Sequence, residues 1–165
     1  MKVAIVMGSE SDWEVVKLAK ETLDSLHVSN EVHVISAHRT PDKAREFALG
    51  AADSGIGVII AAAGCAAHLA GAMAANTTIP VIGIPMEGGV LGGLDALLST
   101  VQMPSGVPVA TVGLGASGAK NAGVLAAQII ALNNKNIQKR LKEFKEYLAE
   151  KVKKMDENVK NEAAG

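Results

Sequence analysis

Short apolar runs alternate with longer amphipathic segments along the first 133 residues, and this alternation leaves few possible folds. Val3–Met7 is unbroken, as expected of a strand buried on both faces. We predict the other strands at 31–36, 58–61, 79–84 and 108–112. The first helix is predicted from the apolar stripe of Val16, Ala19, Leu23 and Leu26, and the others over 41–54, 68–75, 94–102 and 117–132. Strands joined through helices form parallel sheets covered on both faces. The pattern therefore predicts an α/β fold, a three-layer doubly wound parallel five-stranded sheet.

The C-terminal segment carries a different pattern, an apolar stripe in an otherwise charged and polar stretch: Ile137, Leu141, Phe144, Leu148, Val152, Met155 and Val159. A helix over 134–159 would run roughly 39 Å at 1.5 Å per residue, which is more than one small sheet can cover. We therefore expect an α/β catalytic domain at 1–133, an extra amphipathic helix at 134–160 that contacts a neighbouring subunit, and a disordered tail at 161–165. The alternative is a helix that packs back on its own domain.

Composition excludes several classes of function. Lys and Arg total 16 against 17 Asp and Glu, and 2% of the residues are aromatic, so we expect no nucleic-acid partner. Val3–Met7 is too short for a signal-peptide core or a membrane span. The single cysteine, Cys65, excludes an internal disulfide and favours a reducing, cytoplasmic location. The four histidines lack the spacing of a ligand set, so we expect no metal site.

Ser36–Pro41 places a hydroxyl, an imidazole and a guanidinium where a strand ends and a helix begins. Thr40 is a suitable N-cap and Pro41 suits the first helical position. Open α/β sheets bind ligands at such corners, so Ser36, His38 and Arg39 are candidate site residues. The alternative is that they only solvate a turn.

Gly8–Asp12 forms a similar corner after the first strand. Its hydroxyls and backbone N–H groups precede a helix, an arrangement that favours an anion. We expect the two corners to converge on one phosphate, with Arg39 making a bidentate contact. Asp12 would be repelled by a phosphate, so we expect it to accept hydrogen bonds from sugar hydroxyls.

Two other features have plainer interpretations. Residues 113–118 match G-x-G-x-x-G, but no strand with an acidic residue follows, so we do not predict a dinucleotide there. Cys65 follows the third strand in a loop of small residues. We expect it to be a small buried thiol rather than a nucleophile.

Four ordered motifs carry a family resemblance: Val6–Trp13, Ser36–Pro41, Gly64–Leu69 and Val101–Thr111. Over residues 3 to about 132 the chain resembles the N(5)-carboxyaminoimidazole ribonucleotide mutases of purine biosynthesis, also called phosphoribosylaminoimidazole carboxylase catalytic subunits. The resemblance implies a homo-octamer of flavodoxin-like subunits. It also implies an isomerase without a cofactor, which moves a carboxylate from an exocyclic amine to the neighbouring ring carbon of a ribonucleotide.

The resemblance also implies roles for individual residues. Ser9, Ser11, Ser36 and Arg39 would hold the 5′-phosphate and Asp12 the ribose, and His38 would shuttle a proton at the ring carbon. The base and carboxylate pocket would be lined by Gly64, His68 and Leu69.

The loop around Gly64 departs from the family pattern, because Ala62, Cys65 and Ala70 replace two glycines and a proline. The side chains of Ala62 and Cys65 would enter a region where backbone alone is usual. Ala66–Leu69 favours the mutases over a related class that carboxylates aminoimidazole ribonucleotide directly with CO2. That direct carboxylase and a non-catalytic phosphate-sugar binding module remain alternatives.

Overall fold

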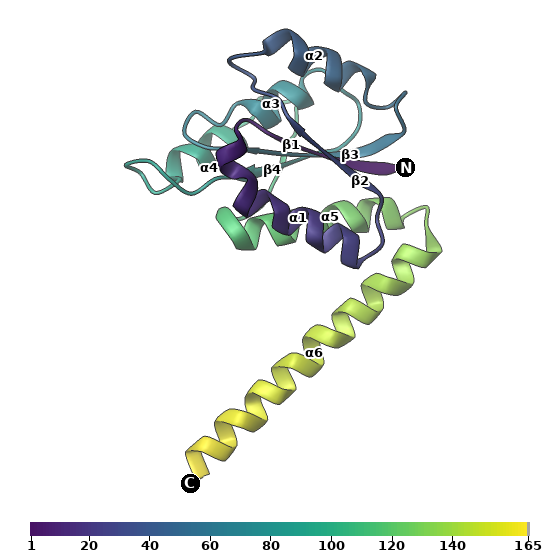
Figure 1. Ribbon diagram of the computed structural model, residues 1–165, viewed down its shortest axis with the longest axis vertical. Coiled ribbons are helices and arrows are strands. Elements are labelled where there is room, and N and C mark those ends of the chain that lie inside the picture. The colour runs from purple at the N-terminus through teal and green to yellow at the C-terminus, as the bar shows by residue number, and fades with distance from the viewer. Residues whose placement is uncertain (165) are drawn as a thin grey trace.

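Five parallel strands form the centre of the computed structural model, which describes residues 1–164 (Figure 1). Their order in the sheet is β2-β1-β3-β4-β5, and every neighbouring pair is parallel. The predicted sheet is therefore confirmed. The strands are β1 (Lys2–Met7), β2 (Asn30–Val34), β3 (Ile56–Ala63), β4 (Val81–Pro85) and β5 (Ala110–Thr111). β5 is shorter than predicted, and Pro108 within the predicted span has no N–H to donate to a ladder.

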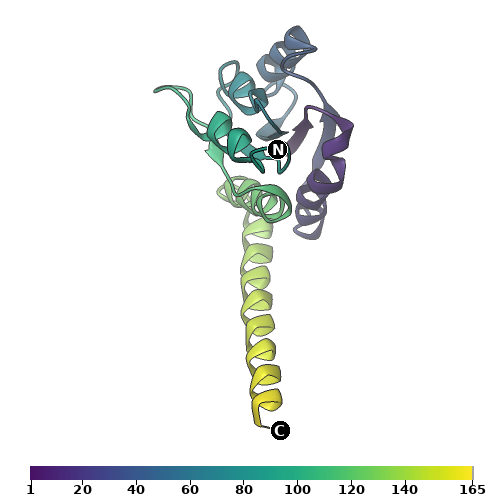
Figure 2. The same ribbon diagram turned by 90° about the vertical axis from the view of Figure 1, so that its left-hand side faces the viewer.

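Helices cover both faces of the sheet, which confirms the three layers (Figures 1 and 2). α1 and α5 pack together on one face, whereas α2 and α3 pack together on the other. Ile5 and Val6 belong to opposite cores because successive strand residues point to opposite faces. The helices are the 3-10 turn η1 (Glu10–Asp12), α1 (Trp13–Ser25), α2 (Pro41–Gly50), α3 (Leu69–Ala74), α4 (Leu94–Val101), α5 (Gly115–Ala131) and α6 (Lys135–Ala164).

The capping prediction for Thr40 is wrong in its chemistry. Thr40 occupies the N-cap position of α2, but its hydroxyl makes no cap hydrogen bond. Instead, Thr40 Oγ1 donates to the carbonyl of Ser36 at 2.9 Å and accepts from its N–H at 3.1 Å. The hydroxyl therefore closes the turn that carries His38 and Arg39. Ser9 does cap η1, because its side chain accepts from the N–H of Ser11.

Gly118 of the G-x-G-x-x-G stretch is explained by packing at the start of α5. A Cβ on Gly118 would lie 1.6 Å from the carbonyl oxygen of Gly113, so no side chain fits there. α5 is followed directly by α6, and no strand lies between them. The motif therefore allows the first turn of α5 to approach the preceding loop closely.

α6 spans 30 residues, roughly 45 Å at 1.5 Å per residue. Ile137 is buried, and Leu141 and Phe144 pack partly against the core. Beyond them the helix leaves the α/β body, as Figures 1 and 2 show, and the remainder of the stripe is exposed: Leu148, Val152, Met155 and Val159. The distal part of this helix therefore lies outside the α/β body, and its contact with a neighbouring subunit stays a prediction.

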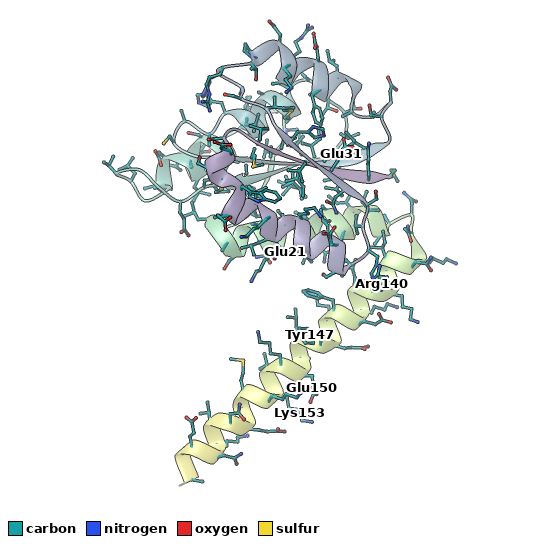
Figure 3. All side chains as sticks on the ribbon, viewed as in Figure 1. Glu21, Glu31, Arg140, Tyr147, Glu150 and Lys153 are labelled. Atoms are coloured by element: carbon teal, nitrogen blue, oxygen red, sulfur yellow. The ribbon has the colours of Figure 1, made fainter. Side chains whose placement is uncertain are left out.

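The far end of α6 also differs from expectation. Residues 161–164 continue the helix where we expected a disordered tail, and residue 165 of that tail lies outside the described residues. Figure 3 shows Glu150 and Lys153 on the part of α6 beyond the α/β body.

Among residues 1–164, no helix combines the length and apolar content needed to cross a membrane.

Candidate active site

The loops that follow β1, β2 and β3 meet at the carboxyl edge of the sheet. β1 lies between β2 and β3, and the chain reverses its direction of progress along the sheet there. This is the topological switch point at which open α/β sheets bind ligands. Ile35 N donates to Met7 O at 2.9 Å, and Gly8 N donates to Ala62 O at 3.3 Å. These two bonds hold the three loops beside one another.

A cavity of about 460 Å³ lies between the three loops. The structure brings all nine predicted site residues to it: Ser9, Ser11, Asp12, Ser36, His38, Arg39, Gly64, His68 and Leu69. It is also lined by Cys65 and by four residues that we did not name as site residues: Gly8, Ala37, Ala63 and Ala66. Each of these lies at or just beyond the end of a strand. Proximity to a strand end was therefore the signal that could have identified them.

The corner after β1 is built around the 3-10 turn η1. Ser11 Oγ donates to Ser9 Oγ at 2.9 Å, and the N–H of Asp12 donates to the carbonyl of Ser9 at 3.2 Å. Partial burial raises the pKa of the Asp12 carboxyl, and hydrogen bonds with the Ser11 side chain and the Ser9 backbone oppose that rise. The corner thus presents two hydroxyls beside one half-buried acid.

Arg39 connects the corners after β1 and β2. Its Nη2 donates to the carbonyl of Gly8 at 3.1 Å, and its Nε donates to Ser36 Oγ at 3.4 Å. The backbone N–H of Arg39 also donates to Ser36 Oγ, at 3.1 Å. A guanidinium has five N–H donors, so these contacts leave others available to a ligand oxygen. Arg39 is the one Lys or Arg side chain that lines this cavity.

Two imidazoles that line the cavity are in contact with each other. His38 follows β2 and His68 occupies the N-cap position of α3. His38 Nε2 lies 2.8 Å from His68 Nδ1, and the rings meet edge to face with centroids 4.9 Å apart. One nitrogen donates and the other accepts, according to the tautomers. Among residues 1–164, no cluster of three or more His, Cys, Asp or Glu side chains could hold a metal ion.

The expectation that Cys65 is buried is wrong. Its side chain is exposed and lines the cavity, and its backbone is left-handed, with φ +53°. The buried position in this loop is taken by Ala67, which is fully buried. Ala62 and Ala70 are buried in the two cores, so they fill space beneath the site. Of the three departures from the family loop, Cys65 alone lines the cavity.

Comparisons with known proteins agree with this arrangement. A family model described as AIR carboxylase matches residues 2–151. The N5-carboxyaminoimidazole ribonucleotide mutase of Aliivibrio fischeri is 51% identical over 152 residues, covering 92% of this chain and 94% of the relative. That of Bacillus subtilis is 55% identical over 144 residues, covering 87% and 89%. The crystal structure of Treponema denticola PurE matches with a TM-score of 0.84 at 27% identity, covering 96% of this chain and 98% of that one.

Proposed function

The chain belongs to the AIR carboxylase family, and on this premise we propose that it interconverts N5-carboxyaminoimidazole ribonucleotide and 4-carboxy-5-aminoimidazole ribonucleotide in purine biosynthesis. The resemblance drawn from the four sequence motifs is confirmed by these relatives. One observation carries the proposal to this site: the anion-binding corner and the imidazole pair line the same cavity. The protein is then an isomerase.

The substrate would lie along the cavity with its charged end at the β1 and β2 corners. Ser9, Ser11, Ser36 and Arg39 hold the 5′-phosphate, through hydroxyl and guanidinium donors. Asp12 accepts hydrogen bonds from the ribose hydroxyls. The base then reaches the other side of the cavity, where Gly64, His68 and Leu69 surround it and its carboxylate.

The chemistry requires one proton carrier. The exocyclic nitrogen loses a carboxylate and gains a proton, while the ring carbon gains the carboxylate and loses a proton. A single group can therefore give a proton to the nitrogen, take one from the carbon and end unchanged. His38 is that group, because an imidazole can both accept and donate a proton and this one lines the cavity. His68, in hydrogen-bond contact with it, positions the carboxylate.

The carboxylate is proposed to leave as CO2 and to be recaptured inside the cavity. Holding CO2 against the ring carbon makes its capture effectively intramolecular. To test this, substrate labelled in the carboxylate is converted in unlabelled bicarbonate, and conversion is followed by the absorbance change. Most of the label should remain in the product. The name of the family supports direct carboxylation by CO2 as the second candidate, and complete loss of label would favour it.

The assembly is proposed to be a cytoplasmic homo-octamer in which α6 contacts a neighbouring subunit. Four apolar residues of its stripe are exposed: Leu148, Val152, Met155 and Val159. Contiguous exposed apolar surface of this kind favours association. No nucleic-acid or membrane partner is proposed.

A further inference from the structure

A second cavity adjoins the first at the phosphate corner. It has a volume of about 520 Å³ and shares four lining residues with the first: Gly8, Ser9, Ser36 and Arg39. Its other walls include Glu10 and Lys43. The Arg39 side chain, which donates hydrogen bonds to Gly8 and Ser36, lines both cavities. A group bound at Arg39 is accessible from either side.

The charges of the first cavity do not balance a phosphate. A phosphate monoester carries about −1.5 to −2 at neutral pH. Asp12 also lines the cavity and adds negative charge when ionised, whereas Arg39 is the one Lys or Arg among the lining residues. An uncompensated anion in a partly enclosed site is costly. A second cation near Arg39 would reduce that cost.

Lys43 is placed to supply this charge. It lies in the first turn of α2, three residues after the N-cap Thr40. A cation there opposes the helix dipole, so Lys43 does not favour α2 electrostatically. Lys43 is exposed and makes no ion pair within 4.0 Å among residues 1–164.

We propose that Lys43 contacts the 5′-phosphate of the substrate from the second cavity, as a positioning residue that acts together with Arg39. This inference rests on the proposed placement of the phosphate at Ser9, Ser36 and Arg39. Lys43 contacts no reacting atom, so it contributes to binding and leaves the chemical step unchanged. Glu10, on the same cavity, opposes it by adding negative charge.

Binding of ribose 5-phosphate, measured by calorimetry, tests the proposal without requiring turnover. Lys43→Gln should weaken binding by about 1.5- to 5-fold, the range for an exposed charge pair. Lys43→Arg should restore it, and Glu10→Gln should tighten it. Arg45→Gln is the matched control, because Arg45 is an exposed cation of α2 that lines neither cavity. Its affinity should equal that of the parent.

The outcomes separate this proposal from the proposed function. If Lys43→Gln binds ribose 5-phosphate as the parent does, or if Arg45→Gln weakens binding equally, the contact does not exist. Failure of the parent to bind ribose 5-phosphate overturns it as well. With the carboxyamino ribonucleotide, Lys43→Gln should raise KM and leave kcat unchanged. A parent that binds ribose 5-phosphate but does not isomerise this ribonucleotide refutes the function and leaves the phosphate contact intact.

Discussion

His38 Nε2 lies 2.8 Å from His68 Nδ1, although the two residues are 30 positions apart in the chain. Each neutral imidazole has one N–H donor and one acceptor nitrogen, so this bond requires one ring to donate and the other to accept. The bond cannot persist if both rings are protonated, because both facing nitrogens would then be donors. The proposed proton carrier and the histidine proposed to position the carboxylate are thus one hydrogen-bonded pair.

His38→Asn should lower turnover by about 10² to 10⁴-fold, the usual contribution of a general acid–base group. Substrate binding should persist, because the hydroxyls and the guanidinium of the phosphate corner are unchanged. Steady-state kinetics and calorimetry measure the two effects. His68→Asn is the comparison, and a positioning role predicts that it affects KM more than His38→Asn does. If His38→Asn turned over within a few-fold of the parent, His38 would be a spectator and His68 would be the better candidate for the proton carrier. If neither variant altered any measured property, the protein would be a non-catalytic binding module.

His27→Gly should stabilise the protein. His27 follows α1 with φ +55°, and the bonds His27 N to Asp24 O and Val28 N to Leu23 O, both 2.9 Å, form a Schellman motif. Glycine adopts this left-handed conformation without the steric cost of a Cβ, about 1 kcal/mol. Urea denaturation measures the gain, and His27→Ala, which keeps the Cβ, should show none. Equal stability of the glycine and alanine variants would contradict the prediction.

Gly83→Ala should destabilise the fold by about 1–3 kcal/mol, the usual cost of overpacking. A Cβ on Gly83 would lie 2.3 Å from Thr100 Cγ2 and 3.0 Å from Val109 Cγ1. Thr100→Ser removes the nearer methyl group and keeps the hydroxyl that donates to Ala96 O at 2.7 Å. The double variant should therefore recover part of the loss, and a double-mutant cycle of unfolding free energies measures it. Strict additivity would show that the two side chains do not collide.

The free energy of unfolding should fall slightly in acid because Glu31 becomes protonated. The hydrogen bond from Lys2 is the main cause that lowers the pKa of this carboxyl. Partial burial raises the pKa, and a hydrogen bond with His33 lowers it further. A lowered folded-state pKa contributes stability above the unfolded value of 4.5, and that stability is lost as the pH falls through the folded value. Both side chains are about one-third exposed, so we expect at most about 1 kcal/mol.

Lys2→Met tests this ion pair. Its unfolding free energy should be below that of the parent at pH 7, and the difference should shrink below pH 4.5, where protonation of Glu31 removes the pair. Lys139→Met is the control, since Lys139 pairs with Glu143 within α6 and both are well exposed. A difference that is independent of pH would mean that Lys2 acts by packing.

Truncation within α6 should change the assembly. A chain ending after Glu146 keeps Ile137, Leu141 and Phe144, which pack against the core, and loses the exposed stripe. It should remain folded by circular dichroism and show a lower mass by light scattering. A chain ending after Ala131 loses the core contacts as well and should be less stable or insoluble. An unchanged mass for the longer truncated chain would show that the stripe does not contact a neighbour.

The sequence by itself determined the sheet and the location of the site. Apolar periodicity is a local property, so β1 to β4 and the helices could be recognised segment by segment. In a parallel sheet the carboxyl ends of the strands share one edge, so Ser9, Ser36 and Gly64 had to lie near one another once the strands were assigned. The order of the strands, β2-β1-β3-β4-β5, came from the tertiary structure.

The tertiary structure decided the contacts within the site. The bond between His38 and His68, the left-handed backbone of Cys65 and the turn-closing hydroxyl of Thr40 depend on the exact positions of loops from different strands. The same holds for Lys43, which lines the second cavity together with Ser9 and Arg39 although these residues belong to different segments of the chain. The stripe of α6 is continuous in sequence, but the size of the α/β body decides where burial ends, after Phe144. Local patterns carry no information about such distances, because packing between distant segments sets them.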